Sequence, residues 1–366
     1  MHQRRIVLLA NEYTTILNFR MELIKELMNQ GHMVFVVIPD HQNNVDIAAI
    51  GCKVVNYSIS RKGMNPLIEL KVIKMIEKTL EKIKPDIVFT FTIKPNIYGG
   101  LACAKNEIPY VANITGLGTA VENGGIFQKF SLYLYKMGLK KAKKVFFQNT
   151  ENKDFMLQHK VVAGNYDLLP GSGVNLEKFH VLPYPKTKEI HFMYLARVMK
   201  EKGIEEYVEA ATAIKEKFPY TRFHVCGMCE QGYEVKMKEW VEKDILIYHG
   251  QVKTIPEMHR ISQCTIHPSY YPEGMSNVLL ESAACARPII TTDRSGCREI
   301  IDDGINGFIV RQKDSRDLIK KIEQFIKLPW EEKEKMGLAG RKKVENEFDR
   351  KIVVDKYINE LDHLTD

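Results

Sequence analysis

Short apolar runs alternate with helix-like stretches along most of the chain, and this alternation limits the folds that the chain can adopt. Strand, helix and strand at this spacing are typical of a parallel sheet that carries helices on both faces. The runs are apolar at successive positions, as strands buried on both faces should be. The sequence therefore predicts an α/β protein built on doubly wound parallel sheets.

The alternation occurs in two blocks with a proline-containing stretch between them. In the first block, the expected strands are residues 6–10, 34–39, 53–58, 87–92, 110–113, 145–149 and 167–169, and the expected helices are residues 17–30, 66–82, 97–105 and 126–141. In the second block, the expected strands are residues 190–196, 222–227, 245–249, 265–268, 289–292 and 308–310. Residues 181–189 contain two prolines and few apolar residues, so we interpret them as a linker.

The length of 366 residues favours two domains over a single core. We predict an N-terminal Rossmann-like domain at 1–180, the linker at 181–189, and a C-terminal Rossmann-like domain at 190–345. A last helix within 346–366 is expected to pack back towards the first domain. Ligands of such sheets bind beyond the carboxyl ends of the strands, so two domains facing across a cleft are expected.

Composition narrows the class of protein. Hydrophobic residues make up 45% and charged residues 27%, which is typical of a globular protein. No run of about eighteen apolar residues occurs, and we interpret the short apolar run after the basic N-terminus as a first strand rather than a secretion signal. The seven cysteines are scattered through apolar segments, which suits reduced thiols in the cytoplasm. The lone pair Cys226 and Cys229 is interpreted as a strand end rather than a metal or redox site.

One segment of the second block has the composition of a ligand site. Glu273 and Glu281 flank the start of a helix expected at residues 277–286, and a loop containing Gly274 precedes it. Backbone N–H groups at a helix start can bind an anion. Carboxylates before and on that helix can accept hydrogen bonds from hydroxyls on either side of a phosphate. A phosphate flanked by hydroxyl-bearing groups describes a nucleotide sugar.

Two cations follow the first strand of the same block. Arg197 and Lys202 lie across a strand-to-helix turn, and a guanidinium and an ammonium at this spacing can bracket a diphosphate. The alternative is a solvated basic turn. The presence of Glu273 and Glu281 downstream favours the diphosphate interpretation.

Several strings resemble the C-terminal domain of family 4 glycosyltransferases, a retaining group with the GT-B fold. They are ARVMKEKG (196–203), GQV (250–252), HPSYYPEGMSNVLLESAACARPII (267–290) and GCREIIDDGINGFIV (296–310), and they occur in the family order. In the first block, ILNFR (16–20), TIKPNIYGGLACA (92–104) and NITGLGTA (113–120) resemble a subgroup found in bacterial polysaccharide gene clusters. The resemblance implies two Rossmann-like domains and sugar transfer.

The resemblance also implies roles for single residues. Arg197 and Lys202 would bind the donor diphosphate and neutralise the leaving nucleotide, Glu281 would hold the ribose hydroxyls, and Glu273 would bond the transferred sugar. Backbone amides of the loop would meet sugar and phosphate oxygens, and the residues concerned are Gly274, Met275, Ser276 and Asn277. Val252 would lie near the base. The alternative for Glu281 is a solvated helix position, and for Glu273 a carboxylate that stabilises the helix start.

The first block departs from the family pattern. Many members place a histidine where Thr115 precedes Gly116 in this chain, and the usual glycine-rich first loop is replaced by NEYTTILNFR. The candidates for contacts with the acceptor in this block are Asn18, Arg20, Lys94, Asn96, Thr115 and Gly116. For Arg20, Lys94 and Asn96, solvation on a helix face or loop is the alternative. No D-x-D triplet occurs, so we predict transfer without a metal or other cofactor.

Charge is concentrated in the first block. Residues 1–180 hold 23 Lys and Arg against 15 Asp and Glu, a net +8, whereas the whole chain carries +7. The stretch from Phe127 to Lys144 is expected to form a basic helix that contains six lysines and no acidic residue. The same stretch also contains the apolar residues Phe130, Leu134 and Met137. Such a helix suits an anionic membrane surface, and a peripheral position at the inner face of the cell membrane is expected. The alternative is a surface helix that packs one face on the core.

These observations lead to one function and several alternatives. We expect a retaining glycosyltransferase that moves a sugar, an N-acetylhexosamine or a deoxy relative, from a UDP-linked donor. The acceptor would be a polyprenyl-diphosphate-linked saccharide in capsule, O-antigen or exopolysaccharide synthesis. The alternatives are a nucleotide-sugar epimerase or hydrolase of the same fold, or a sugar-binding homologue without activity. A nucleic-acid-binding module is disfavoured because no zinc pattern or RNA-binding aromatic motif occurs.

Overall fold

A computed structural model describes residues 2–40, 44–57, 66–118, 121, 124–230, 232–252 and 254–363, without the side chains of 66–68. The end of the strand expected at 53–58, at residue 58, and the last two residues of the NITGLGTA string, at 119–120, lie outside these ranges. The chain forms two compact units. The first contains residues 1–172, 272–275 and 350–366, and the second contains residues 173–271 and 276–349. Residues 181–189 thus belong to the second unit, in which Leu182 and Tyr184 are buried.

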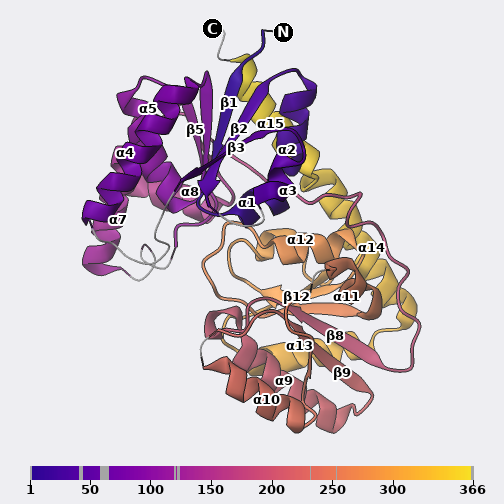
Figure 1. The fold of residues 1–366 in the computed structure, drawn as a ribbon. Helices are drawn as coiled ribbons and strands as arrows, with labels where there is room; N and C mark the ends of the chain where they lie inside the picture. The colour runs from indigo at the N-terminus through magenta and orange to yellow at the C-terminus, as the bar shows by residue number, and fades with distance from the viewer. Residues whose placement is uncertain are drawn as a thin grey trace. The chain divides into compact units, whose positions relative to one another are not determined.

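The first unit contains a seven-stranded parallel sheet (Figure 1). Its strands are β1 (Arg5–Leu9), β2 (Met33–Pro39), β3 (Lys53–Tyr57), β4 (Ile87–Phe91), β5 (Tyr110–Ile114), β6 (Lys144–Phe147) and β7 (Tyr166–Leu168). They lie in the order β3-β2-β1-β4-β5-β6-β7. The chain therefore proceeds from β1 first to one edge and then to the other, which is the doubly wound arrangement predicted from the sequence.

The second unit contains a six-stranded sheet whose named strand pairs are all parallel. Its strands are β8 (Ile190–Leu195), β9 (Thr221–Cys226), β10 (Ile247–Tyr248), β11 (Cys264–His267), β12 (Ile289–Thr292) and β13 (Gly307–Val310). Their order is β10-β9-β8-β11-β12-β13. The predicted fold class, two Rossmann-like parallel-sheet domains, is confirmed.

Helices cover the sheet of the first unit, and several differ from the expected bounds. The helices are α1 (Tyr13–Phe19), α2 (Met21–Asn29), α3 (Asn44–Ala48), α4 (Pro66–Ile83), α5 (Gly100–Lys105), α7 (Gly125–Leu139), α8 (Thr150–Gln158) and α15 (Arg350–Asp362), with a π-helix at Pro95–Gly99. The helix expected at 17–30 is interrupted at Arg20, whose backbone leaves the helical region. The expectation of one helix as far as Lys144 is also wrong, because Lys144 opens β6.

The second unit has its own set of helices. They are α9 (Ile204–Lys217), α10 (Tyr233–Glu242), α11 (Ile255–Ile261), α12 (Asn277–Ala284), α13 (Ser315–Lys327) and α14 (Trp330–Glu347). Helix α12 ends before the expected residue 286, because Ala286 has a positive φ of 56° and leaves the helix. All seven cysteines are free, and β9 ends at Cys226, as expected for a strand end.

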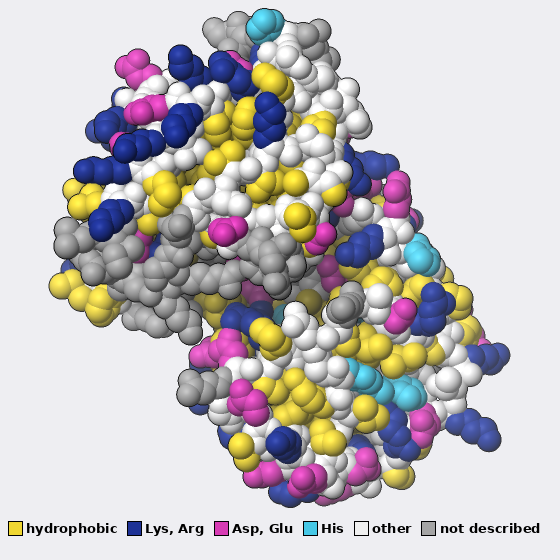
Figure 2. Space-filling model, viewed as in Figure 1, with side chains coloured by type: hydrophobic (Ala, Val, Ile, Leu, Met, Phe, Trp, Pro, Cys, Tyr) yellow, Lys and Arg dark blue, Asp and Glu magenta, His cyan; other side chains and the backbone are white. Residues whose placement is uncertain are grey.

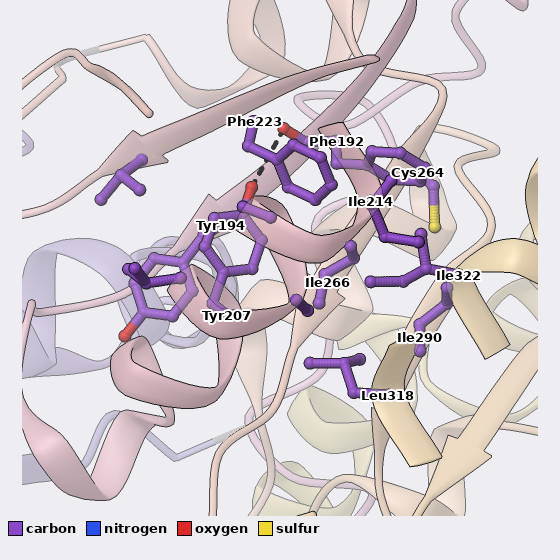
Figure 3. Close-up of a cluster of buried hydrophobic side chains, with 14 of the residues drawn as sticks. Phe192, Tyr194, Tyr207, Ile214, Phe223, Cys264, Ile266, Ile290, Leu318 and Ile322 are labelled. Carbon is purple, nitrogen blue, oxygen red and sulfur yellow. Dashed lines mark hydrogen bonds between the residues drawn. The ribbon is translucent and has the colours of Figure 1, made fainter. Parts of the chain in front are cut away.

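The main core of the second unit lies on one face of its sheet (Figure 3). Phe192 and Phe223 stack with ring centroids 4.9 Å apart, and Tyr207 lies edge-on to Phe223. The single hydroxyl proton of Tyr207 is shared between the carbonyls of Phe192 and His224, which lie 3.3 and 3.0 Å from the hydroxyl oxygen. Alternate residues of β8 and β9 thus fix α9 against the sheet, because the buried hydroxyl has partners in the strands themselves.

The C-terminal helix α15 is part of the first unit and packs beside α2 (Figure 1). Tyr357 is fully buried among Phe89, Phe91 and Phe146, and its hydroxyl accepts a 2.6 Å hydrogen bond from the carboxamide of Asn113. At the start of the helix, Arg350 lies 2.9 Å from the Glu22 carboxylate. The last turns of the chain therefore contribute to the first core.

Three histidines form a ladder on the other face of the second sheet. Nδ1 of His191 lies 2.8 Å from Nε2 of His224, and Nδ1 of His224 lies 2.9 Å from Nε2 of His249. The Glu189 carboxylate lies 3.5 Å from Nε2 of His191 and favours a proton there. Three neutral rings then satisfy this series of hydrogen bonds, since each ring donates one N–H to its neighbour. A second proton on His224 would place its Nδ1–H against the Nε2–H of His249. Figure 2 shows histidines grouped on the surface of this unit.

These contacts predict acid sensitivity of the second unit. Burial, followed by the neighbouring His191 and His249, lowers the pKa of His224 from 6.5 to about 3. Burial also lowers the pKa of His259 and His267 to about 3. Since each folded-state pKa is below the unfolded value, these histidines stabilise the folded state fully above pH 6.5, and this contribution is lost as the pH falls. Protonation of each histidine should lower the free energy of unfolding by about 1.4 kcal/mol per pH unit below 6.5.

Tryptophan fluorescence during urea unfolding measures this loss, because both tryptophans, Trp240 and Trp330, lie in the second unit. We expect the urea midpoint to fall between pH 7.5 and 5.5, and His224→Phe to reduce that fall. His180→Gln, at an exposed position, is the matched control. Equal midpoints at the two pH values would contradict the neutral ladder.

Candidate active site

Arg197 and Lys202 lie close together at the carboxyl end of β8. The guanidinium of Arg197 lies 5.6 Å from the ring centroid of Tyr271, and the ammonium of Lys202 lies 4.8 Å from the same centroid. Arg197 follows the strand, and Lys202 ends a short 3-10 helix (Lys200–Lys202). The same aromatic ring therefore makes cation–π contacts with both cations.

The two cations differ in their access to solvent. The side chain of Arg197 is 49% exposed and pairs with Glu230, which is 44% exposed. Such surface pairs contribute little stability, so a bound anion can replace Glu230 at small cost. Lys202 is only 8% exposed. Burial, and then the positive charge of Arg197, lowers the pKa of Lys202 from 10.5 to about 8. An anion placed here would favour the charged ammonium.

Glycines let the backbone approach closely around these cations. Gly203 has a φ of 75°, and a Cβ there would overlap the carbonyl of Pro268 at the end of β11. Gly227, with a φ of 150°, would overlap the carbonyl of Ala196. Only a residue without a side chain fits at these two positions. The turn that carries Lys202 can therefore lie directly over the carboxyl ends of the central strands.

The start of α12 has free hydrogen-bonding capacity. Ser276 occupies the N-cap position but does not cap the helix with its side chain; its hydroxyl lies 3.4 Å from Nε2 of the buried His267. The carboxamide oxygen of Asn277 is buried, and no described residue donates a hydrogen bond to it. A hydroxyl or amide of a ligand would satisfy this acceptor. The first turn of α12 can therefore receive both an anion and a hydrogen-bond donor.

Two further predicted residues lie in the second unit. Glu281 is half-buried on α12 and interacts with other residues. Val252 follows β10 after Gly250 and packs with Met193, Leu195 and Cys226. Both therefore follow or belong to elements at the carboxyl edge of the sheet, where ligands of parallel sheets bind.

Residues 272–275 pack with the first unit. The carboxamide of Asn149 donates hydrogen bonds to the carbonyls of Glu273 and Gly274 at 3.1 and 2.6 Å. A Cβ on Gly274 would overlap the carbonyl of Thr115 and the side chain of Gln148, and Gly116 lies beside the same loop. The structure thus brings Glu273, Gly274, Thr115 and Gly116 together. Met275 is buried.

The other candidates in the first unit occupy different surroundings. Arg20 is only 1% exposed, with its guanidinium 4.5 Å from the Phe91 ring, and burial lowers its pKa. Asn96 is fully buried between the Thr90 hydroxyl and the Asn113 carbonyl. Lys94 pairs with Glu69 at 2.7 Å. Asn18 is exposed, and its carbonyl accepts a hydrogen bond from Arg350. The structure places Arg20 and Asn96 in the core instead of on an acceptor surface.

Sequence reasoning missed four residues that shape the site: Tyr271, Glu230, His267 and Asn149. Tyr271 and His267 lie inside the recognised string at 267–290, so their neighbourhood was identifiable from the sequence. Glu230 and Asn149 had no signal, because they are far in sequence from the groups that they bind.

No group of three or more His, Cys, Asp or Glu side chains in the described ranges is arranged to hold a metal ion. No helix of the described chain has the length and apolar character needed to cross a membrane.

Two family models match the chain. The model described as "Glycosyl transferase 4-like" matches residues 5–149, and the model described as "Glycosyl transferases group 1" matches residues 177–343. The two matched ranges do not overlap, and each falls mainly in one of the two units.

Two named relatives cover most of the chain. It is 27% identical over 378 residues to the N,N'-diacetylbacillosaminyl-diphospho-undecaprenol alpha-1,3-N-acetylgalactosaminyltransferase of Campylobacter jejuni, with 98% of this chain and 99% of the relative covered. It is 26% identical over 308 residues to the capsular polysaccharide biosynthesis glycosyltransferase CapM of Staphylococcus aureus, with 78% of each covered.

Solved structures share the fold. A glycosyltransferase from Rickettsia africae has a TM-score of 0.80 at 19% identity, over 100% of this chain and 99% of that one. HepE of Anabaena, solved in complex with UDP, has a TM-score of 0.81 at 16% identity, over 98% and 99%. Both span the two units of this chain.

Because the backbone at Gly203 lies close to the carbonyl of Pro268, a single added methyl group should destabilise the folded protein. Gly203→Ala should lower the free energy of unfolding by about 1–3 kcal/mol more than Gly232→Ala. Gly232 is the matched control because its φ is also positive, at 94°, but a Cβ there would meet nothing within 4 Å. Urea unfolding followed by tryptophan fluorescence measures both. Equal losses would show that only the backbone angle matters and not the contact with Pro268.

Proposed function

The chain belongs to the family 4-like glycosyltransferases with the GT-B fold, and from this premise we propose that it moves a sugar from a UDP-linked donor to a lipid-linked saccharide, with retention of anomeric configuration. The observation that carries the donor assignment is the pair of cations, Arg197 and Lys202, that contact the Tyr271 ring at the carboxyl edge of the second sheet. Two adjacent cations match the two phosphates of a nucleoside diphosphate.

In this proposal the diphosphate is both anchor and leaving group. When the bond between the sugar C1 and the phosphate oxygen breaks, negative charge grows on that oxygen. Lys202 and Arg197 are already oriented there, so they stabilise this charge without reorganisation. Arg197 exchanges the Glu230 carboxylate for phosphate oxygens. Lys202 is desolvated before the donor arrives, which strengthens its attraction to an anion.

The remaining donor contacts follow from α12 and its loop. The backbone amides of Ser276 and Asn277 are proposed to meet phosphate or sugar oxygens, while the buried Asn277 side-chain oxygen accepts from a hydroxyl. Glu281 is proposed to accept from the ribose hydroxyls, and Val252 to contact the base. Glu273, Gly274 and Met275 are proposed to bind the transferred sugar, with Asn149 positioning the loop.

The sugar and acceptor are proposed from the relatives. The Campylobacter jejuni enzyme is named for N-acetylgalactosamine transfer to a saccharide on diphospho-undecaprenol, and CapM is named for capsule synthesis. We therefore propose an N-acetylhexosamine or a deoxy relative as the donor sugar. The proposed acceptor is a polyprenyl-diphosphate-linked saccharide for a surface glycan.

Such an acceptor calls for contact with a membrane, and α7 offers a surface for it. Four apolar side chains on this helix, Ile126, Phe130, Tyr133 and Met137, are 77%, 53%, 59% and 44% exposed. Their spacing of four, three and four residues places them along one face of the helix. We propose that these apolar side chains insert into the headgroup region at the inner surface of the cell membrane. Of the six lysines expected here, Lys144 pairs with Glu360, Lys143 bonds the His363 carbonyl, and Lys141 lies 3.5 Å from the Ala104 carbonyl. Lys129, Lys136 and Lys140 are left for lipid headgroups.

The lowered pKa of Lys202 predicts a pH dependence of donor affinity. The ammonium attracts the diphosphate only when protonated, so UDP affinity should fall as the pH rises through about 8. Lys202→Arg should bind with much less dependence between pH 7 and 9, because a guanidinium stays charged. Lys200→Arg, at an exposed position of the same turn, is the matched control and should keep the dependence. Calorimetric titration with UDP measures this, and a flat profile for the wild type would contradict the role of Lys202.

Removal of Arg197 should mainly slow transfer. We expect Arg197→Ala to lower kcat about 10²–10³-fold, the scale for losing one preorganised group at a developing charge. Arg311→Ala removes an exposed, carboxylate-paired arginine of the same unit and should leave kcat unchanged. The assay follows transfer of an N-acetylhexosamine from its UDP conjugate to a polyprenyl-diphosphate saccharide, with EDTA present. Unaltered turnover in Arg197→Ala, or loss of wild-type activity in EDTA, would contradict the metal-free diphosphate site. Sugar released or epimerised without acceptor would favour a hydrolase or epimerase.

A further inference from the structure

The structure contains a cavity that the donor and acceptor assignments do not use. It lies in the first unit where the C-terminal part of α7 meets the loop that precedes β7, and its volume is about 340 Å³. Two segments line it: side chains between residues 133 and 145, and residues 160–165. We propose that this cavity binds the phosphate headgroup and upper chain carbons of one anionic bilayer phospholipid. The proposal rests on the membrane contact of α7 proposed above and names its partner.

The charges around the cavity fit a phosphate. Lys136 and Lys140 contribute from the end of α7, and Lys160 contributes from the second lining segment. All three are exposed, and none forms an ion pair with a described residue. No aspartate or glutamate is among the lining residues. Three cations from two segments around one cavity, without a carboxylate among the lining residues, attract a compact anion such as a phosphate monoanion.

The floor of the cavity fits carbon rather than water. Leu139, Val145, Val161 and Val162 are buried and line it. An inorganic phosphate would use the lysines and leave this apolar surface uncovered. An amphiphile would fill both parts, since burial of apolar area contributes about 25 cal/mol per Å² in addition to the ionic contacts. The combination of a basic rim and an apolar floor therefore selects a lipid over a free anion.

The cavity is continuous with the exposed face of α7. Tyr133 and Met137 belong to that face and also line the cavity. The face from Ile126 to Met137 is about 16 Å long at 1.5 Å per residue, so it can lie along a bilayer surface while the cavity lies at its C-terminal end. Figure 2 shows basic and hydrophobic side chains side by side on the part of the first unit that carries α4, α5 and α7. A lipid taken from the adjoining leaflet can thus reach the cavity without leaving the surface.

Soluble lipids test the cavity without a bilayer. Dihexanoyl-phosphatidylglycerol, kept below its micelle concentration, should bind the full chain saturably and one to one in a calorimetric titration. Dihexanoyl-phosphatidylcholine, whose headgroup has no net charge, should bind at least about tenfold more weakly. Lys160→Glu should weaken phosphatidylglycerol binding at least about tenfold. Lys25→Glu, the same charge change at an exposed position on α2, should leave it unchanged.

Several results would overturn the proposal. They are absence of saturable binding, equal binding by Lys160→Glu and the wild type, inorganic phosphate binding as tightly as the lipid, or preference for geranyl phosphate. The last result would assign the cavity to an isoprenoid phosphate, which is the chemistry of the acceptor. Phe130→Ser keeps every cavity residue and should lose sedimentation with phosphatidylglycerol vesicles while still binding the soluble lipid. Wild-type chain that binds soluble lipid but no vesicles would contradict only the membrane contact of α7.

Discussion

The site depends on holding two positive charges next to each other at a sheet edge where one of them is nearly removed from water. Desolvation opposes the ammonium of Lys202 and lowers its pKa to about 8, and Arg197 adds to the effect. The surroundings that make this possible are structural: Tyr271 presents its ring to both cations, and Gly203 brings the turn onto the carbonyl of Pro268. Burial destabilises the charged ammonium, and a diphosphate that binds beside it offsets this destabilisation.

Much of the fold was predictable because it follows local pattern. The parallel strands are nearly continuous apolar runs, and the expected strands match the observed ones to within about two residues at their ends. Breaks within helices were less visible. The chain bends at Arg20, whose side chain is buried against Phe91 and Tyr357, so a tertiary environment overrides a helical pattern there. Lys143 and Lys144 looked like part of a basic helix, yet they lead into and open β6, and their partners are at the other end of the chain.

At the site, the sequence pointed to the charged side chains, whereas the residues that contact them became visible only in the structure. Arg197, Lys202, Glu273 and Glu281 were proposed from their chemistry, their spacing and the family resemblance, and the structure places Arg197 and Lys202 against one ring and Glu273 beside Asn149. Their supports were not predicted, because Asn149 and Glu230 act across long sequence separations. Arg20 and Asn96 show that a candidate chosen from the sequence can instead be buried in the core. A polar residue in a family-like string resembles a surface candidate, but the hydrogen bonds of Asn96 and the ring contact of Arg20 lie within the core. Burial of a polar side chain cannot be read from local sequence when its partner is distant.

We propose that a nucleoside diphosphate is held by Arg197, Lys202 and the start of α12 without a metal. Amide hydrogen exchange of the full chain, with and without UDP and in the presence of EDTA, is the sharpest test. We expect UDP to slow exchange in peptides covering residues 197–203 and 276–281, with little change in the core strands β8 and β12. Protection confined to other segments, or protection that appears only after a divalent cation is added, would contradict it.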